Sequence, residues 1–297
     1  MAAKAAPGLR KEKAMGFKDI LVTVDTAPAG LGRVELAAGL AERFKAHLVG
    51  LHTSVSPLPT RGGYFDFFDR SLLDPLYREF AEKMGAQAEA ARALFDEVAQ
   101  RRALAAEWRV STGYPSEAAA LHGRYVDLIV LGQTDPDEPE APLFRPLPEE
   151  VALAVGRPVL VVPYAGRFNE VGRRVLVAWD ASRAATRAVN DAMPLLIGAH
   201  SVTVLCLDPS EAPGGHGEVP GADIALHLAR HGVKATVEAT ASGGIGIGNA
   251  LLSRANDLGA DLLVMGAYGH ARVRELLLGG ATQTILETMT LPVLMAH

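Results

Sequence analysis

Cysteine is almost absent from this chain, which has 297 residues and a single thiol, Cys206. One cysteine cannot form an intrachain disulfide, so a fold held together by disulfides is excluded. This composition is compatible with a reducing compartment, and the cytoplasm is the location we expect.

The chain also lacks a long apolar run and an excess of basic residues. No stretch of about 18 uncharged apolar residues occurs, so no membrane span is predicted. Residues 1–13 are rich in Ala, Lys and Arg without the apolar centre of a secretory signal, so we expect a flexible leader over residues 1–16. The net charge of −5 argues against nucleic acid or an acidic membrane as the partner.

The sequence patterns of common metal and catalytic sites are missing as well. The nine histidines show neither His-x2-His nor His-Glu-x2-His spacing, which leaves a zinc site unsupported. No Gly-x-Ser-x-Gly motif is present, and Cys206 lies in an apolar run with no activating base beside it. We therefore assign no catalytic residue and no metal ligand.

What the chain does contain is a long internal repeat. The matching runs are residues 20–25 with 175–180, residues 127–132 with 261–266, and residues 157–161 with 291–295. The first pair is 155 residues apart and the other two pairs are 134 residues apart, so the first copy is 21 residues longer. The second strands, 47–52 and 201–206, are 154 residues apart, which places most of the excess near residues 56–77.

The order of elements indicates an α/β fold. Apolar β-rich runs alternate with helical patterns such as residues 34–41 and 184–193, which predicts parallel sheets. Strand runs that are apolar at every position are typical of strands covered by helices on both faces. We predict two tandem, doubly wound, Rossmann-like domains over residues 17–164 and 173–297, each with about five strands, joined by a linker over residues 165–172.

The extra segment of the first copy is aromatic and rich in turn residues over positions 57–68. Two interpretations remain open. The segment is either a lid that packs on its own domain or a cover for a partner or ligand.

A glycine-rich segment follows the fourth strand of the second copy. Gly266 and Gly269 let the backbone turn tightly, and Gly279 and Gly280 precede a helix predicted over residues 281–288. Ligands of open parallel sheets bind beyond the carboxyl ends of the strands, and free N–H groups at a helix start favour an anion. Together with the hydroxyl of Thr282, this segment predicts a phosphate cradle.

The spacing Gly-x2-Gly-x9-Gly after an apolar strand resembles the nucleotide loop of the universal stress protein family. Both halves follow that family's order of elements, over about residues 17–163 and 173–297, so the chain resembles a tandem member. In ATP-binding members the matching positions line the nucleotide site. In this chain those positions are Ala178, Trp179, Asp180, Cys206, Met265, Gly266, Gly269, Gly279, Gly280, Ala281 and Thr282.

Four of these positions have a second interpretation. Asp180 matches an aspartate near the adenosine, but it is equally suited to cap a helix. Cys206 matches a base-binding position, but it also suits a buried core site. Trp179 would either stack on a base or fill its pocket. Gly280 stands where the family has Ser or Thr, and the missing hydroxyl would weaken phosphate binding by about 1 kcal/mol.

The first copy has lost most of the cradle. Gly132 matches Gly266, but the positions of Gly269, Gly279, Gly280 and Thr282 are taken by Asp135, Arg145, Pro146 and Pro148. Proline removes an amide donor, and the added acidic residues repel phosphate. We therefore expect no triphosphate in the first domain, whose acidic loop is either a surface connection or a docking segment.

The resemblance implies a cytoplasmic stress-response protein that binds ATP, with or without Mg²⁺, as a regulatory ligand of the C-terminal domain. It also implies an internal pseudo-dimer in which residues 159–162 and 293–295 pair or pack, and further homodimerisation is compatible with it. Two other functions stay open: an interaction scaffold that works without nucleotide, and a slow ATP hydrolase or nucleotidyl transferase.

Overall fold

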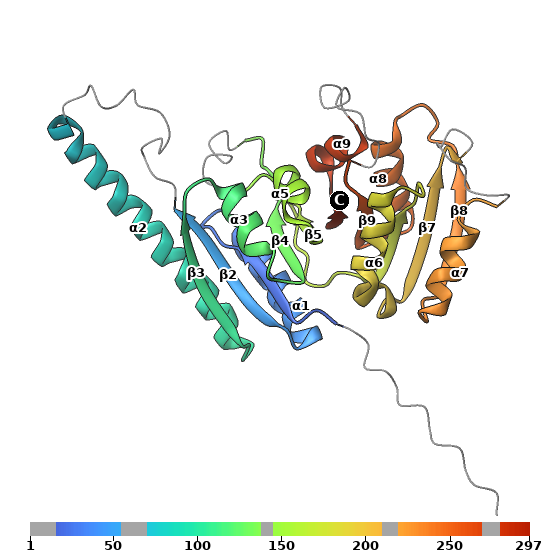
Figure 1. The fold of residues 1–297 in the computed structure, drawn as a ribbon, viewed down its shortest axis with the longest axis horizontal. Coiled ribbons are helices and arrows are strands. Elements are labelled where there is room, and N and C mark those ends of the chain that lie inside the picture. Colours follow the sequence, from blue (N-terminus) through green and yellow to red (C-terminus); the bar gives the residue numbers. More distant parts are fainter. Residues whose placement is uncertain (1–15, 55–69, 138–144, 210–218, 269–279) are drawn as a thin grey trace, which may run out of the picture.

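One continuous ten-stranded sheet forms the centre of the molecule (Figure 1). The computed structural model describes residues 16–54, 70–137, 145–209, 219–268 and 280–297. The expected leader therefore lies almost wholly outside the described residues, as do Gly269 and Gly279.

The first half alternates strands and helices. Its elements are β1 (Asp19–Thr23), α1 (Gly30–Phe44), β2 (His47–Ser54), α2 (Arg70–Arg101), β3 (Ala106–Thr112), α3 (Pro115–Gly123), β4 (Leu128–Gly132), α5 (Pro148–Val155) and β5 (Val159–Val162).

The second half repeats the same order. Its elements are β6 (Arg174–Ala178), α6 (Arg183–Ile197), β7 (Ser201–Leu207), α7 (Ala222–Arg230), β8 (Ala235–Thr240), α8 (Ile247–Asp257), β9 (Leu262–Gly266), α9 (Ala281–Thr288) and β10 (Val293–Ala296). Helix α9 has the bounds predicted from the sequence.

The strand order is β3-β2-β1-β4-β5-β10-β9-β6-β7-β8. Within each half all neighbouring strands run parallel, and the order reverses beside the first strand of that half, as in doubly wound folds. The halves meet where β10 pairs antiparallel with β5, with Leu294 opposite Leu160. The predicted α/β class with parallel sheets is confirmed, and the two closing strands are hydrogen-bonded neighbours.

Helices cover both faces of this sheet, which explains why its strands are apolar at successive positions. Ile20 and Val22 of β1 belong to a buried cluster that includes residues of α1, α2, α6 and α7. Leu21 between them belongs to a second cluster that includes residues of α3, α5, α8 and α9. Each cluster contains residues of both halves, so the two halves share their core on each face.

The aspartates that open β4 and β9 have a structural role in both copies. Asp127 Oδ2 accepts backbone hydrogen bonds from Lys18 and Asp19 at the start of β1. Asp261 accepts the equivalent bonds from residues 172–174 at the start of β6. The repeat of these aspartates therefore reflects how each first strand is fixed to its neighbour.

Much of the extra length of the first half lies in a helix. Helix α2 has 32 residues, whereas its counterpart α7 has nine. Residues 70–77 of the predicted excess belong to α2, while residues 57–68, the aromatic and turn-rich part, lie outside the described ones.

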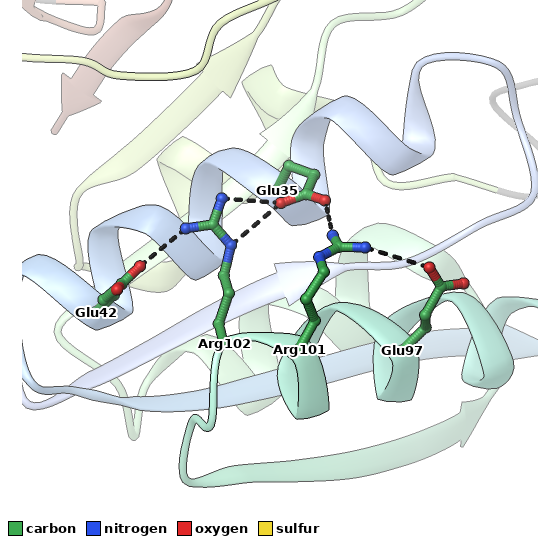
Figure 2. Close-up of polar contacts among 5 residues, drawn as sticks. All are labelled: Glu35, Glu42, Glu97, Arg101 and Arg102. Carbon is green, nitrogen blue, oxygen red and sulfur yellow. Dashed lines mark hydrogen bonds and ion pairs between the residues drawn. The ribbon is translucent and has the colours of Figure 1, made fainter.

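An ion-pair network fixes the end of α2 against α1 (Figure 2). Arg102 donates to Glu35 at 3.0 Å and to Glu42 at 2.9 Å, and Arg101 pairs with Glu35 and Glu97. These side chains are between 27% and 76% exposed, so water screens the network and its contribution to stability is modest.

The halves also touch through single polar contacts. Arg43 of α1 donates to the carbonyl of Val171, in the connection between β5 and β6, at 3.0 Å. Val171 itself is buried in the first core cluster, so the predicted linker is packed at this point. Among the helices of the described residues, none combines the length and apolarity needed to cross a membrane.

Candidate functional site

In the second half, the start of α6 packs closely against the carboxyl end of β9 because Gly266 has no side chain. A Cβ at Gly266 would lie 2.5 Å from the backbone nitrogen of Ala185 and 2.8 Å from the Cβ of Ala184. Only glycine therefore lets the start of α6 approach the end of β9 this closely. This contact places the turn that contains Asp180 beside the predicted cradle.

Asp180 does not cap helix α6. The N-cap is Ser182, whose hydroxyl accepts from the N–H of Ala185 at 3.1 Å. Asp180 Oδ1 instead accepts from the N–H of Ser182 at 2.9 Å and fixes the turn that leads into the helix. The sequence interpretation of Asp180 as the helix cap is therefore wrong by two residues, and Ser182 was missed.

The loop after β9 is closed by Thr282. Its Oγ1 accepts from the N–H of Tyr268 at 3.3 Å, and only 6% of Thr282 is exposed. Tyr268 has φ of +54°, which is uncommon for a residue with a side chain. Thr282 thus joins the start of α9 to the end of β9.

Within the part of the chain that the structure describes, nothing covers the N-terminus of α9. Gly280 is its N-cap, has no side chain to accept a hydrogen bond, and is exposed, and no atom of the described residues lies within 4 Å of the place its Cβ would take. The first turn of α9 carries no acidic residue. The free N–H groups and the positive end of the helix dipole are therefore available to an anion.

The remaining predicted site residues differ in accessibility. Cys206 is fully buried, and burial, with a smaller effect from the charge of Asp180, raises the pKa of its thiol. Met265 is also buried, at 5% exposure, whereas Ala178 and Trp179 are half-buried. Trp179 packs against the first core cluster, so part of its ring fills space within the fold.

In the first half, arginine side chains occupy the corresponding edge. Arg33 of α1 is 3% exposed, donates to the carbonyl of Thr23 at 2.9 Å, and pairs with Asp25 at 2.6 Å. Arg145 lies 3.5 Å from the same Asp25 carboxylate. A Cβ at Gly132 would lie 2.4 Å from Arg33 Nη1, so the glycine makes room for the guanidinium.

The charge of Asp25 is stabilised by this arrangement. Burial by itself would raise the pKa of Asp25, but the charges of Arg33 and Arg145 and the N–H of Ala27 outweigh it and hold the pKa below its usual value. A small pocket remains here between the ends of β1 and β4 and the start of α5, with both arginines in its wall.

Sequence reasoning missed Arg33, although a signal was present. Arg33 lies 155 residues before Ala188, the same offset that relates Asp25 to Asp180. An arginine among apolar helix positions, with alanine as its counterpart in the other copy, was the signal in the sequence. Within the described ranges, no three His, Cys, Asp or Glu side chains form a group that could hold a metal ion.

Comparison with known proteins gives the family of the second half. The model of the Universal stress protein family matches residues 172–297. No curated protein sequence matches the chain.

The solved structures extend the likeness of fold to both halves. A universal stress protein from Archaeoglobus fulgidus DSM 4304 matches with a TM-score of 0.71 and 16% identity over 94% of this chain and 95% of its own. A protein of unknown function from Pseudomonas aeruginosa PAO1 matches with a TM-score of 0.53 and 16% identity, over 94% of this chain and 92% of its own.

Proposed function

Because residues 172–297 belong to the universal stress protein family and the first half repeats the same fold, we propose that this chain is a stress-response protein whose second half binds ATP or a related adenine nucleotide as a regulatory ligand. The nucleotide would lie at the carboxyl edge of β6, β7 and β9, with its phosphates at the start of α9. Mg²⁺ would enter with the phosphates of the nucleotide.

The observation that carries this proposal is the open N-terminus of α9 beside the end of β9. Helix α6 of the same half has its first turn closed by Ser182, whereas α9 begins at Gly280 without a side-chain cap. An uncapped helix start without acidic residues, placed beyond the carboxyl ends of parallel strands, has the properties of a phosphate site.

The structure of the first half favours one nucleotide per chain, because the corresponding edge of the first half is already occupied by its own ion pairs. Arg33 and Arg145 already pair with Asp25, the counterpart of Asp180. A nucleotide at this edge would have to displace a buried ion pair, which costs several kcal/mol. The proposal therefore assigns nucleotide binding to the second half alone.

Two substitutions at Gly280 test the proposal without disturbing the fold. Gly280 has φ of −68° and ψ of 166°, the extended conformation of an ordinary N-cap, and its surroundings leave room for a side chain. Gly280→Asp supplies a good cap but places a carboxylate at the phosphate position, so we expect ATP to bind at least about tenfold more weakly. Gly280→Ser supplies a hydroxyl worth about 1 kcal/mol, so we expect about fivefold tighter binding.

The measurement is calorimetric titration of ATP, ADP and AMP, with and without Mg²⁺. Ala222→Asp is the matched control, since it adds an acidic residue to the first turn of α7 in the same half, at an exposed position. No ATP binding by the unmodified protein up to millimolar concentration would reject the proposal in favour of a nucleotide-independent scaffold. Phosphate release in single-turnover assays would instead favour the hydrolase.

The proposal also includes an internal pseudo-dimer and a cytoplasmic location. The antiparallel pairing of β5 with β10 supports the pseudo-dimer, because it relates two strands that occupy the same place in each half. Light scattering across a concentration series would show whether whole chains associate further.

A further inference from the structure

Gln133 belongs to the first half, but its side chain contacts helix α9 of the second half. It follows β4 directly and is 5% exposed. Its Nε2 donates to the carbonyl of Leu286 at 2.8 Å and to the carbonyl of Glu287 at 3.2 Å. These carbonyls lie in the last turn of α9, where a helix has no partners of its own for its oxygens.

The Gln133 side chain is held in this position from its own half. Its Oε1 accepts from the N–H of Tyr164 at 3.3 Å, and its backbone N–H donates to the carbonyl of Val162 at 2.8 Å. Both amide atoms therefore have partners, and a rotation of the side chain would leave buried polar groups unpaired. Gln133 links the end of β5 to the end of α9.

Helix α9 depends on such support more than a longer helix would. It has eight residues, and Thr282 and Ile285 are the ones buried in it. At 1.5 Å per residue it is about 12 Å long, so its last turn and the proposed phosphate site at its first turn belong to one short rigid unit. A movement of the last turn would therefore also move the N–H groups at the first turn.

Among the residues that the structure describes, helix α5, the counterpart of α9 in the first half, receives no equivalent contact from the second half. The residue that corresponds to Gln133 is Ala267, which has no side-chain amide. Where α5 ends, Arg187 of α6 donates to the carbonyl of Gly156 at 2.6 Å instead. The glutamine contact thus serves only the helix that carries the open N-terminus.

We propose that Gln133 is a positioning residue for nucleotide binding. Gln133 belongs to the first half and fixes the position of α9, and the position of α9 sets the affinity of the second half for phosphate. This inference rests on the proposed nucleotide function. It makes the first half, which holds no nucleotide itself, a contributor to the site of the second.

Gln133→Met tests this role because methionine keeps the length of the side chain and removes both polar atoms. We expect ATP to bind three- to tenfold more weakly, since two hydrogen bonds that hold α9 are lost. Gln133→Glu should lose more affinity, because a carboxylate would face the carbonyl oxygens. Thr288→Val is the matched control: Thr288 is exposed in the last turn of α9 and its Oγ1 donates to the carbonyl of Thr284, so its removal should leave affinity unchanged.

Amide hydrogen exchange without nucleotide provides a second readout. The N–H of Thr284 donates to the carbonyl of Gly280 at 3.1 Å and reports the first turn of α9. We expect this amide to exchange faster in Gln133→Met, while the amides of β4 exchange at the same rate as in the wild type. If the methionine variant does not fold, Gln133→Asn should show the same change.

The two readouts separate the inference from the function it rests on. Equal exchange at Thr284 in the wild type and in the folded variant would overturn the inference, whether or not ATP binds. Equal ATP affinity of wild type and Gln133→Met would also overturn it. Failure of the wild type to bind ATP would overturn the proposed function, while the exchange result would still decide whether Gln133 positions α9.

Discussion

The two halves of this chain place the same aspartate at the end of their first strand and surround it in opposite ways. Asp25 is enclosed by Arg33 and Arg145, and Gly132 makes room for a guanidinium. Asp180 holds the turn before α6, and Gly266 makes room for the backbone of that helix. At one edge arginine side chains pair with the aspartate, and at the other helix α9 begins without a side-chain cap.

The comparison shows which features of the fold the two halves share and which differ at this edge. The fold, the strand order and the glycine after the fourth strand are the same in both halves. What differs is an arginine where Ala188 stands in the second half and a loop whose glycines have become Asp135 and Arg145. If the second half binds nucleotide as proposed, the first half has an ion pair where the second has a binding site.

The largest effect should follow from Arg33→Met, which leaves the Asp25 carboxylate, whose side chain is only 19% exposed, without its main partner. Removing one member of a buried ion pair costs about 3 kcal/mol of unfolding free energy. Urea denaturation would measure the loss. Arg101→Met, in the exposed network of Figure 2, is the control and should cost less than about 1 kcal/mol. Equal losses in the two variants would show that the first edge is not stabilised by its arginine.

The two equivalent glycines should respond differently to alanine. At Gly266 the new Cβ would collide with the backbone of α6, so we expect a loss of about 2–3 kcal/mol and weaker ATP binding. At Gly132 it would collide with the end of the Arg33 side chain, which can shift, so we expect about 1–2 kcal/mol and unchanged ATP binding. Thermal melting and ATP titration of both variants would measure the two losses. A larger loss of stability or of ATP affinity at Gly132 than at Gly266 would contradict the difference between the edges.

A smaller effect should appear in the pH dependence of stability. The pKa of Asp25 is lower in the folded protein than in the unfolded chain, so the unfolded state binds protons first as the pH falls. The contribution of Asp25 is fully present well above pH 4 and is lost as the pH falls through its folded pKa.

In Arg33→Met the Asp25 carboxylate loses its main partner. Acidification should therefore lower the free energy of unfolding of this variant less than that of the wild type. The stability difference between wild type and Arg33→Met should therefore shrink from pH 7 towards pH 3. Urea denaturation across that range measures it, and a difference that stays constant would mean that Asp25 and Arg33 are not energetically coupled.

Much of the fold could be predicted from the sequence because the repeat supplies two independent copies of each pattern. Gly279 and Gly280 marked the start of a helix predicted over residues 281–288, and α9 has these bounds. The contacts that the sequence did not reveal join residues far apart in the chain. Gln133 and Leu286 are 153 residues apart, and no local pattern signals such a contact.

The sequence also left the roles of two residues, Asp180 and Cys206, open between two interpretations. Asp180 and Ser182 are both good N-cap residues, and only the backbone conformation shows that Ser182 takes that place. Cys206 suited either a base contact or the core, and its complete burial places it in the core. For the nucleotide site itself, Gly266, Gly280 and Thr282 lie together at one edge, and their part in binding stays a prediction.

The most direct test of the account is the number and place of the nucleotides bound per chain. Calorimetric titration of the full chain with ATP should give one site, which Gly280→Asp weakens at least about tenfold and Arg33→Met, in a folded sample, leaves unchanged. Two sites per chain, or a single site that survives Gly280→Asp and is altered by Arg33→Met, would contradict the assignment of binding to the second half.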